Sequence, residues 1–464
     1  MSSRLLKIKT RKMDKIFLDN SMGQILEKYQ SKELTPLDVA QSCVSRVKKL
    51  EDKYKAWVCF DEKKLLAEAE KIKLSDNPGN QRLLEGMPVG VKDVFNTTDF
   101  PAQMGSKLWE NFTPGNDARA VFNIKRQGAI IPGKTVTAEF AVHTPGKTLN
   151  PHNIKKSTGT SSSGSAVAVA LGMVPSSLGT QTAGSIMRPA SFCGVYGCKP
   201  SFGLIPRTGI LKTTDTLDTV GFFTVFQKDL RRVFDAIRVK GANFPFSNEA
   251  LNNQNRQNKP ENRPWKVAFV RTYTWDNAYD YAQKSMLEFV KKISDMTGIE
   301  ANEVDLPDIV KNAHKVHGII YNKTLSYYFK NEFQKPELIS PVMSSMIKTG
   351  NQISVNDYHK ALTEQTEIQS VMDDFFKNYD IIISLSTAGE AQERNETERP
   401  DPCLIWTLSH LPAVNIPLFV SPSRLPFGLQ VVARKYNDYL LFNFIDYLAE
   451  LKLIPEKPNP LLNI

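Results

Sequence analysis

Apolar residues recur at spacings of three and four over residues 15–73, which is the periodicity of helices with one buried face. Ile25 and Val39 are two of these apolar positions. Thr35 precedes Pro36, a combination typical of a capped helix start. We therefore predict that the chain opens with a set of packed helices.

Runs of small and apolar residues farther along the chain predict strands that are buried on both faces. The predicted strands, some with adjoining turns, are residues 86–93, 129–131, 193–211, 265–270, 379–385, 411–417 and 425–432. Helical spacing is found over residues 117–127, 276–298, 354–376 and 438–451. Strands that alternate with helices indicate a layered α/β fold. Residues 241–264 are rich in Asn, Gln, Pro and Lys and are predicted to be a surface loop or insertion.

The composition is that of a globular protein in a reducing compartment. The 464 residues are 41% hydrophobic and 23% charged, which allows a large core and excludes a disordered or fibrous chain. No stretch of 18 consecutive apolar residues predicts a membrane span. The five cysteines are scattered and odd in number, as expected for free thiols, and they have no zinc-binding spacing.

The chain is basic, with a net charge of +10. This charge suits an anionic neighbour such as RNA, although a compartment-wide basic bias has the same effect and no RNA-binding motif accompanies it. The start of the chain is basic and has no acid before Asp14, which resembles a short mitochondrial targeting segment. The alternative is a basic start that is simply exposed to solvent. We expect a mitochondrial matrix protein with a targeting or disordered segment at residues 1–14 and a single domain at residues 15–464.

Two turns of small residues, within residues 157–189, are the most distinctive stretch of the chain. They are rich in Ser, Gly and Thr. Such turns let several backbone N–H groups point at one ligand atom, as a developing oxyanion requires. A flexible linker has the same composition. Apolar runs at residues 166–171 and 186–196 favour instead two loops held in place by packed segments.

Lys92 ends the predicted strand at residues 86–93, close to small glycines. Desolvation there would lower the pKa of its amine and let the neutral form act as a base. An ion pair with Asp93, or a solvated strand end, is the structural alternative.

Residues 128–135 match the phosphate-loop pattern G-x-x-x-x-G-K-[ST], with Lys134 as its lysine. That loop must lie between a strand and a helix, whereas here the apolar triplet at residues 129–131 falls inside it and a helical segment precedes it. An ATPase is therefore the least favoured function.

Five segments together resemble the amidase-signature hydrolases in their order and approximate spacing. They are residues 86–93, 159–165, 179–189, 196–200 and 425–430. The resemblance runs from about residue 20 to residue 450, and within the family it is greatest to the glutaminase subunits of glutamyl-tRNA(Gln) amidotransferases of the organellar type. It implies an amidase-signature α/β fold, in which helices cover a large mixed β-sheet.

The resemblance also implies a Ser-Ser-Lys triad. Ser185 would be the nucleophile that forms the acyl-enzyme, Ser161 the bridging serine, in a cis peptide, and Lys92 the base. The two serines are 24 positions apart, which is the family's spacing. A neutral lysine that takes a proton through a second hydroxyl group can activate a serine, which alone is a poor nucleophile. The oxyanion hole would be formed by the backbone N–H groups of Thr182, Ala183, Gly184 and Ser185.

The turns depart from the family's usual sequence at four positions. Thr160 and Ser163 replace glycines, and Gln181 and Ala183 stand where Asp and Gly are usual. The added side chains crowd the turns of the oxyanion hole and can slow the reaction. No histidine lies in these turns, and we interpret all six as structural: His143, His152, His314, His317, His359 and His410.

The expected substrate contacts depart from the family as well. The arginine that grips the carboxylate of glutamine falls at Gln365, and an amide cannot replace a bidentate cation without loss. Either Arg394 or Arg399 takes its place, or glutamine binds weakly. The acid that holds the α-amino group falls near Pro400, which makes the adjacent Asp401 its candidate.

The implied function is release of ammonia from glutamine, for a partner that amidates Glu-tRNA(Gln) after ATP-dependent activation. The partners would be the tRNA-binding subunit of the amidotransferase and a small third subunit. ATP and Mg²⁺ would bind to the tRNA-binding subunit, and this chain would bind no metal or nucleotide. The missing arginine favours instead a stand-alone amidase on another small amide. A scaffold without turnover is a third alternative, which the presence of Lys92, Ser161 and Ser185 disfavours.

Overall fold

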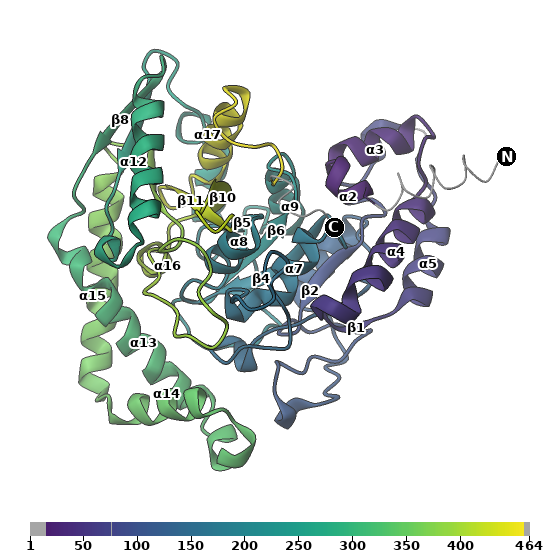
Figure 1. Cartoon of the computed structure of the whole chain (residues 1–464), viewed down its shortest axis with the longest axis horizontal. Helices are drawn as coiled ribbons and strands as arrows, with labels where there is room; N and C mark the ends of the chain where they lie inside the picture. Colours follow the sequence, from purple (N-terminus) through teal and green to yellow (C-terminus); the bar gives the residue numbers. More distant parts are fainter. Residues whose placement is uncertain (1–14, 76, 459–464) are drawn as a thin grey trace.

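An eleven-stranded sheet runs through the centre of the molecule in the computed structural model, which describes residues 15–75 and 77–458 (Figure 1). The targeting segment expected at residues 1–14 lies outside the described residues. The strand order is β1-β3-β2-β4-β6-β5-β10-β11-β9-β7-β8. The strands are β1 (Trp57–Phe60), β2 (Val89–Lys92), β3 (Gly133–Thr135), β4 (Ser176–Gln181), β5 (Tyr196–Lys199), β6 (Thr219–Thr224), β7 (Trp265–Phe269), β8 (Ile299–Glu303), β9 (Ile381–Leu385), β10 (Ala413–Val420) and β11 (Pro426–Ala433).

The sheet is mixed, as expected. β2 pairs in parallel with β3 and β4, and β7 pairs in parallel with β8 and β9. The other pairs are antiparallel. Because parallel neighbours end at the same edge of a sheet, the last residues of β2 and β4, Lys92 and Gln181, lie at one edge. This edge carries the candidate site.

Helices cover the sheet and confirm the predicted α/β class. In Figure 1, α3, α4 and α5 lie at the β1 end of the sheet, and α12 and α15 lie at the opposite end, near β8. The helices are α2 (Ile16–Asp19), α3 (Met22–Gln30), α4 (Pro36–Tyr54), α5 (Glu62–Lys71), α6 (Arg119–Arg126), α7 (Ser163–Ala170), α8 (Met187–Cys193), α9 (Asp229–Ile237), α10 (Pro245–Asn252), α11 (Gln254–Gln257), α12 (Asp280–Ser294), α13 (Ala313–Tyr328), α14 (Pro341–Gln352), α15 (Val355–Phe375), α16 (Leu404–Leu408) and α17 (Asp438–Glu450).

The opening helices are as predicted. Thr35 caps α4 by accepting a hydrogen bond from the backbone N–H of Asp38, whose side chain accepts from the backbone N–H of Thr35. The strand β1 between α4 and α5 was not predicted, because it is only four residues long and three of them are partly exposed.

Three segments differ from their predictions. The expected loop at residues 241–264 contains two helices, α10 and α11. Pro245 is the first residue of α10, and the side chain of Asn253 caps the start of α11. In the expected strand at residues 129–131, Ile130 makes only an isolated bridge, and β3 follows it. The helices α13 and α14, which pack on each other, were not predicted.

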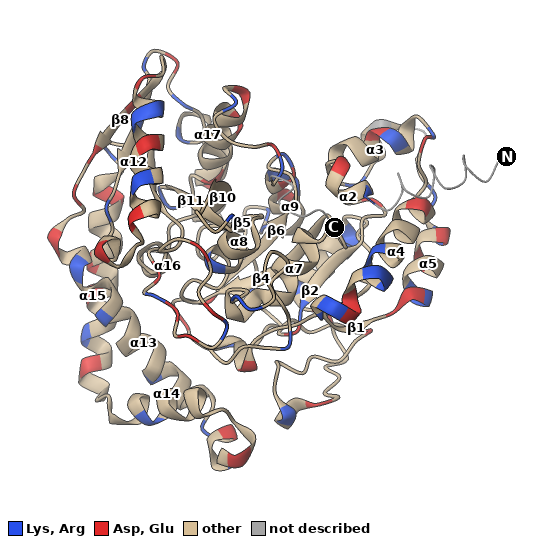
Figure 2. Cartoon of the chain, viewed as in Figure 1, with Lys and Arg blue, Asp and Glu red and all other residues tan. Residues whose placement is uncertain are grey.

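Charged residues lie mainly on the outer elements, whereas α7 is uncharged and completely buried. Figure 2 shows Lys and Arg interspersed with Asp and Glu on α4, α5, α12 and α15. A helix that is apolar on all sides belongs in a core. In the part of the chain that the structure describes, no helix has the length and apolar character needed to cross a membrane.

Candidate active site

Lys92 is completely buried at the end of β2, where its amine faces three hydroxyl groups. The Nζ atom lies 2.9 Å from each of Ser161 Oγ, Ser162 Oγ and Thr180 Oγ1. Burial lowers the pKa of Lys92 well below its usual value, and the charge of Asp218 opposes this only in part. An amine in this setting can be neutral at physiological pH and can act as a base.

Asp93, the alternative partner of Lys92, lies instead 3.4 Å from the Nζ atom of Lys134. That amine also donates to the carbonyl oxygens of Phe95 and Pro101, at 2.7 and 3.0 Å. Lys134 belongs to β3 and is fully buried, so its amine cannot reach a nucleotide phosphate. The phosphate-loop pattern around Lys134 is therefore a coincidence of sequence.

Ser161 lies in a 3₁₀ turn, η4 (Thr160–Ser162), that leads into α7. Its Oγ accepts a hydrogen bond from Lys92 and donates one to the carbonyl oxygen of Ala141, at 2.9 Å. Its own carbonyl accepts from Thr137 Oγ1 at 3.0 Å. The described residues contain no cis peptide bond, so the cis peptide expected at Ser161 is trans in this structure.

The turn after β4 leaves its N–H groups free and binds its carbonyl groups to other elements. Among the described residues, no hydrogen bond has the backbone N–H of any of residues 182–185 as its donor. The carbonyl of Thr182 accepts from His317 Nε2, and that of Ala183 accepts from Thr407 Oγ1, both at 2.8 Å. N–H groups that are fixed in place before the reaction suit an oxyanion.

Gln181 and His317 explain how this turn is held. The Oε1 atom of Gln181 accepts from the N–H groups of Ile186 and Met187, at 2.7 and 3.0 Å, and its Nε2 donates to Thr407 Oγ1. Gln181 therefore organises the start of α8 although it replaces the family's usual acid. Burial lowers the pKa of His317 to about 4, so its ring is neutral and carries its proton on the nitrogen that faces Thr182.

The loop of Ser161 packs directly against the helix that follows Ser185. A Cβ atom on Gly159 would lie 2.5 Å from Pro189 Cα, so only glycine allows this approach. Ser185 is 7% exposed, and none of the hydrogen bonds of the described residues involves its Oγ. The structure thus brings Lys92 and Ser161 into contact, whereas the transfer of a proton from Ser185 stays a prediction.

A cavity of about 700 Å³ opens beside these elements. Its walls include Thr160, Ala183 and Arg188, and on other sides α13 and the loop that precedes α16. Asp401 also lines it, and its carboxylate lies so close to Gly184 that a Cβ atom there would be 2.4 Å from Oδ2. The cavity therefore reaches the predicted oxyanion hole.

Residues 38–442 match the protein family described as Amidase. The chain belongs to this family. A curated relative of this amidase, the A-type subunit of the glutamyl-tRNA(Gln) amidotransferase of Bacillus mycoides (strain KBAB4), is 27% identical over 464 aligned residues, which cover 91% of this chain and 95% of the relative.

Solved structures share the amidase fold. A 6-aminohexanoate cyclic dimer hydrolase complexed with its substrate has a TM-score of 0.82 at 19% identity, over 96% of this chain and 100% of that chain. The corresponding A-type amidotransferase subunit of Thermotoga maritima has a TM-score of 0.74 at 23% identity, over 92% and 93%. Similarity at these identities establishes the common fold.

The structure of the amidase does not bring Gln365 to the cavity. Gln365 is buried on α15 and donates to the carbonyl oxygen of Leu408 at 3.1 Å. Arg394 and Arg399 do line the cavity, but Arg394 donates to the carbonyls of Thr148 and Gly146, and Arg399 donates to a backbone carbonyl elsewhere. Both arginines therefore already donate to backbone carbonyls, and a contact of either one with a substrate carboxylate stays a prediction.

Several residues that shape the site were not identified from the sequence. Ser162 adjoins Ser161, and Thr180 directly precedes Gln181, the last residue of β4, so their places beside Lys92 had a local signal. His317, Thr407 and Arg188 had none, because their contacts join segments that are far apart in the sequence. Three of the histidines interpreted as structural line the cavity: His143, His314 and His317.

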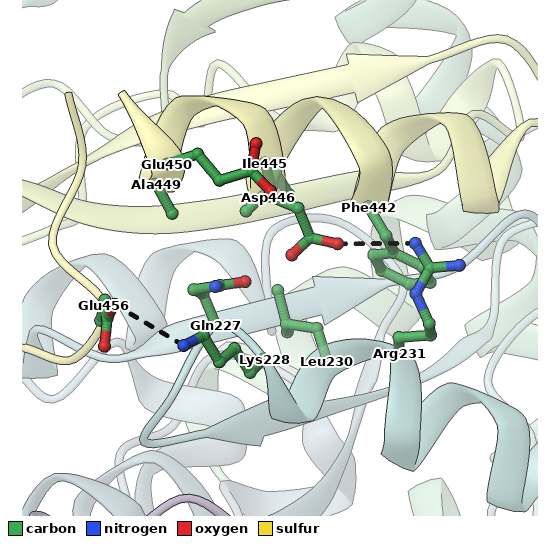
Figure 3. Close-up of a pocket in the computed structure, with 10 residues that line it drawn as sticks. All are labelled: Gln227, Lys228, Leu230, Arg231, Phe442, Ile445, Asp446, Ala449, Glu450 and Glu456. Atoms are coloured by element: carbon green, nitrogen blue, oxygen red, sulfur yellow. Dashed lines mark ion pairs between the residues drawn. The ribbon is translucent and has the colours of Figure 1, made fainter. Parts of the chain in front are cut away.

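A second hollow of the amidase, about 360 Å³ in volume, lies between α9 and α17 and has a different character (Figure 3). Two ion pairs cross it, Lys228 with Glu456 and Arg231 with Asp446, each at 3.6 Å. These charges are well exposed, and no serine or threonine is among the described residues that line the hollow. This hollow offers no nucleophile for amide hydrolysis.

Proposed function

We propose that this chain is the glutamine-hydrolysing subunit of an amidotransferase that converts Glu-tRNA(Gln) to Gln-tRNA(Gln). One observation supports amide hydrolysis above all: the buried amine of Lys92 lies 2.9 Å from Ser161, at the sheet edge where the turn of Ser185 presents four free N–H groups. The choice of this amidase reaction rests on the relative's name and its coverage of nearly the whole chain.

In the proposed reaction, neutral Lys92 takes a proton from Ser161, which takes the proton of Ser185. Ser185 Oγ then attacks the amide carbon, and the N–H groups of residues 182–185 stabilise the resulting oxyanion. The C–N bond breaks as the proton returns to the leaving nitrogen, so that ammonia departs. Water hydrolyses the acyl-enzyme by the same proton path and releases glutamate.

The remaining parts of the assembly follow from the same proposal. A tRNA-binding subunit would receive the ammonia and would bind ATP and Mg²⁺, and a small third subunit would be the other partner. The basic first residues would direct the chain to the mitochondrial matrix.

A stand-alone amidase on another small amide is the second candidate. It is favoured by the position of Gln365, which provides no cation for the carboxylate of glutamine at the cavity. A scaffold without turnover is the third.

Ammonia release from glutamine tests these candidates, with the wild-type chain and its Ser185→Ala variant each co-purified with the tRNA-binding partner. Release by the wild type alone is expected. If the variant keeps glutamine-dependent amidation, the proposed nucleophile is wrong. If neither releases ammonia while both assemble, simple amides separate the stand-alone amidase from the scaffold.

A further inference from the structure

Arg188 is the arginine of the cavity that binds carboxylates. It lies on α8, three residues after Ser185, and is 3% exposed. Its Nε lies 2.9 Å from Glu398 Oε2, and its Nη1 donates to Asp401 Oδ2. Burial alone would lower the pKa of Arg188, but these two carboxylates raise it above its usual value, so the guanidinium stays charged.

Glu398 is held by a small set of donors that we call the carboxylate cradle: Arg188, Thr160 and Ser157. Thr160 Oγ1 donates to Glu398 Oε1 at 2.6 Å, and Ser157 Oγ lies 3.4 Å from the same oxygen. All three donors are at least nine-tenths buried and all three line the cavity. Glu398 is the member of this cluster that can move most easily, because it comes from the loop before α16 and its neighbours at residues 395–397 and 399–400 are exposed.

The backbone of Thr160 supports a functional role for the cradle. Its φ angle is +64°, a left-handed conformation that is unusual for a β-branched residue. Such strain is typical of binding and catalytic sites. The family usually has glycine here, and the threonine supplies the hydroxyl group that contacts Glu398. The substitution that crowds the turn therefore also adds a donor to the cavity.

We propose that the carboxylate cradle binds a carboxylate of the substrate, and that Glu398 occupies the cradle in the free chain and is displaced on binding. The inference rests on the proposed amide hydrolysis at Ser185 and names its substrate class: amides whose acyl part ends in a carboxylate. A planar guanidinium beside hydroxyl donors matches this group. The cradle lies next to both Ser161 and Ser185 in sequence, so it places the carboxylate near the reacting amide.

Exchange of one carboxylate for another leaves the charge of the buried cluster unchanged. Arg188 keeps Asp401 as its second partner throughout, so no buried charge is left unpaired when Glu398 withdraws. Occupation of the cradle by Glu398 lowers the apparent affinity for a substrate carboxylate, because only the fraction of chains whose cradle is open can bind it. Removal of the Glu398 charge should therefore tighten the binding of a carboxylate and leave a neutral amide unaffected.

The test compares two probes of equal chain length, glutaramate, which has a terminal carboxylate, and valeramide, which has none. Calorimetry measures their binding to the full chain carrying Ser185→Ala, so that turnover does not interfere. In this background, Glu398→Gln should lower the Kd of glutaramate about tenfold and leave the Kd of valeramide unchanged. Glu393→Gln is the matched control: it removes an equal charge from the same loop, and its carboxylate is 3.1 Å from Lys156 and has no contact with the cradle.

Two variants of the cradle complete the test. Arg188→Lys keeps a buried cation but loses the planar pair of donors, and Thr160→Val keeps the shape but loses the hydroxyl. Each variant should raise the Kd of glutaramate about tenfold or more and leave the Kd of valeramide unchanged. The proposal is overturned if Glu398→Gln weakens glutaramate or leaves it unchanged, if no variant binds glutaramate, or if both probes change together.

These outcomes are separate from those of the proposed function. Binding to the Ser185→Ala chain needs no hydrolysis, so glutaramate can behave as expected even if the wild type cleaves no amide. Conversely, a wild-type chain that cleaves glutaramate and valeramide equally well, and whose Arg188→Lys variant keeps that ratio, retains its function while the cradle fails.

Discussion

His317 Nε2 lies 2.8 Å from the carbonyl oxygen of Thr182, so a side chain of α13 holds the turn that leads to Ser185. Because the pKa of His317 is lowered to about 4 by burial, this contact is a neutral N–H donor across the usual assay range. His317 touches neither the proposed nucleophile nor the proposed base. It acts as a positioning residue.

Loss of this donor should slow the reaction without weakening substrate binding. In His317→Leu the carbonyl of Thr182 has no partner, and the N–H groups of the turn lose their alignment, so we expect kcat to fall about 10- to 100-fold with KM nearly unchanged. His317→Gln can place an amide donor at the same position and should restore much of kcat. A variant pair with equal kcat would contradict this role.

Lys92 should set the acidic limb of the pH profile. Its neutral form is the proposed base, so kcat/KM should rise with pH as the proton leaves Lys92, with a midpoint well below 10.5. Lys92→Met retains the length and apolar character of the side chain and should lower kcat/KM by about 10³-fold or more. A profile of the same shape in residual Lys92→Met activity would assign the titration to another group.

We expect Gly159 not to tolerate a side chain, because the Cβ atom would clash and the backbone would be strained. Gly203 serves to separate these two effects. Gly159→Ala adds a Cβ atom 2.5 Å from Pro189 at a φ of +81°, so overpacking and backbone strain together should cost about 2–4 kcal/mol. Gly203→Ala has the same strain at a φ of +84° but open space around the Cβ position, and should cost about 1–2 kcal/mol.

Urea unfolding of the two glycine variants measures this difference, and ammonia release reports its effect on the site. Only in Gly159→Ala should ammonia release fall together with the free energy of unfolding, because the added Cβ atom separates the loop of Ser161 from the helix after Ser185. Equal losses of stability in the two variants would mean that the loop and helix can move apart freely.

Local signals explain what the sequence could predict. The apolar run before Lys92 and the continuous β-branched run of β9 specify buried strands, and parallel pairing of β2 with β4 then brings Lys92 to the turns of small residues. Ser161 and Ser185 were predicted as site residues because their spacing matches that of the family. The helices α13 and α14 were missed although the sequence carried signals for them. Buried residues recur at helical spacing on both, as at Val316 and Ile320 on α13, and Ser340 before Pro341 is a capped helix start like that of Thr35 and Pro36.

Contacts across the chain explain what the sequence could not predict. Arg188 and Asp401 are 213 positions apart, and Thr160 and Glu398 are 238 apart, so no pattern of spacing connects them. Alignment on local motifs placed the family's arginine at Gln365, whose amide turned out to join α15 to the end of α16. The cation that we propose for the substrate carboxylate, Arg188, lies instead in the first turn of α8.

The carboxylate of Asp401 rests against Gly184, within the turn whose N–H groups are proposed to hold an oxyanion. An unpaired negative charge there would oppose the charge that develops during the reaction, and Arg188 neutralises it. Loss of the charge of either residue alone would leave the other charge unpaired beside this turn. Over evolutionary time the two positions should change together, and amidases that lack the arginine should also lack the acid, with glycine at 184 released from its constraint.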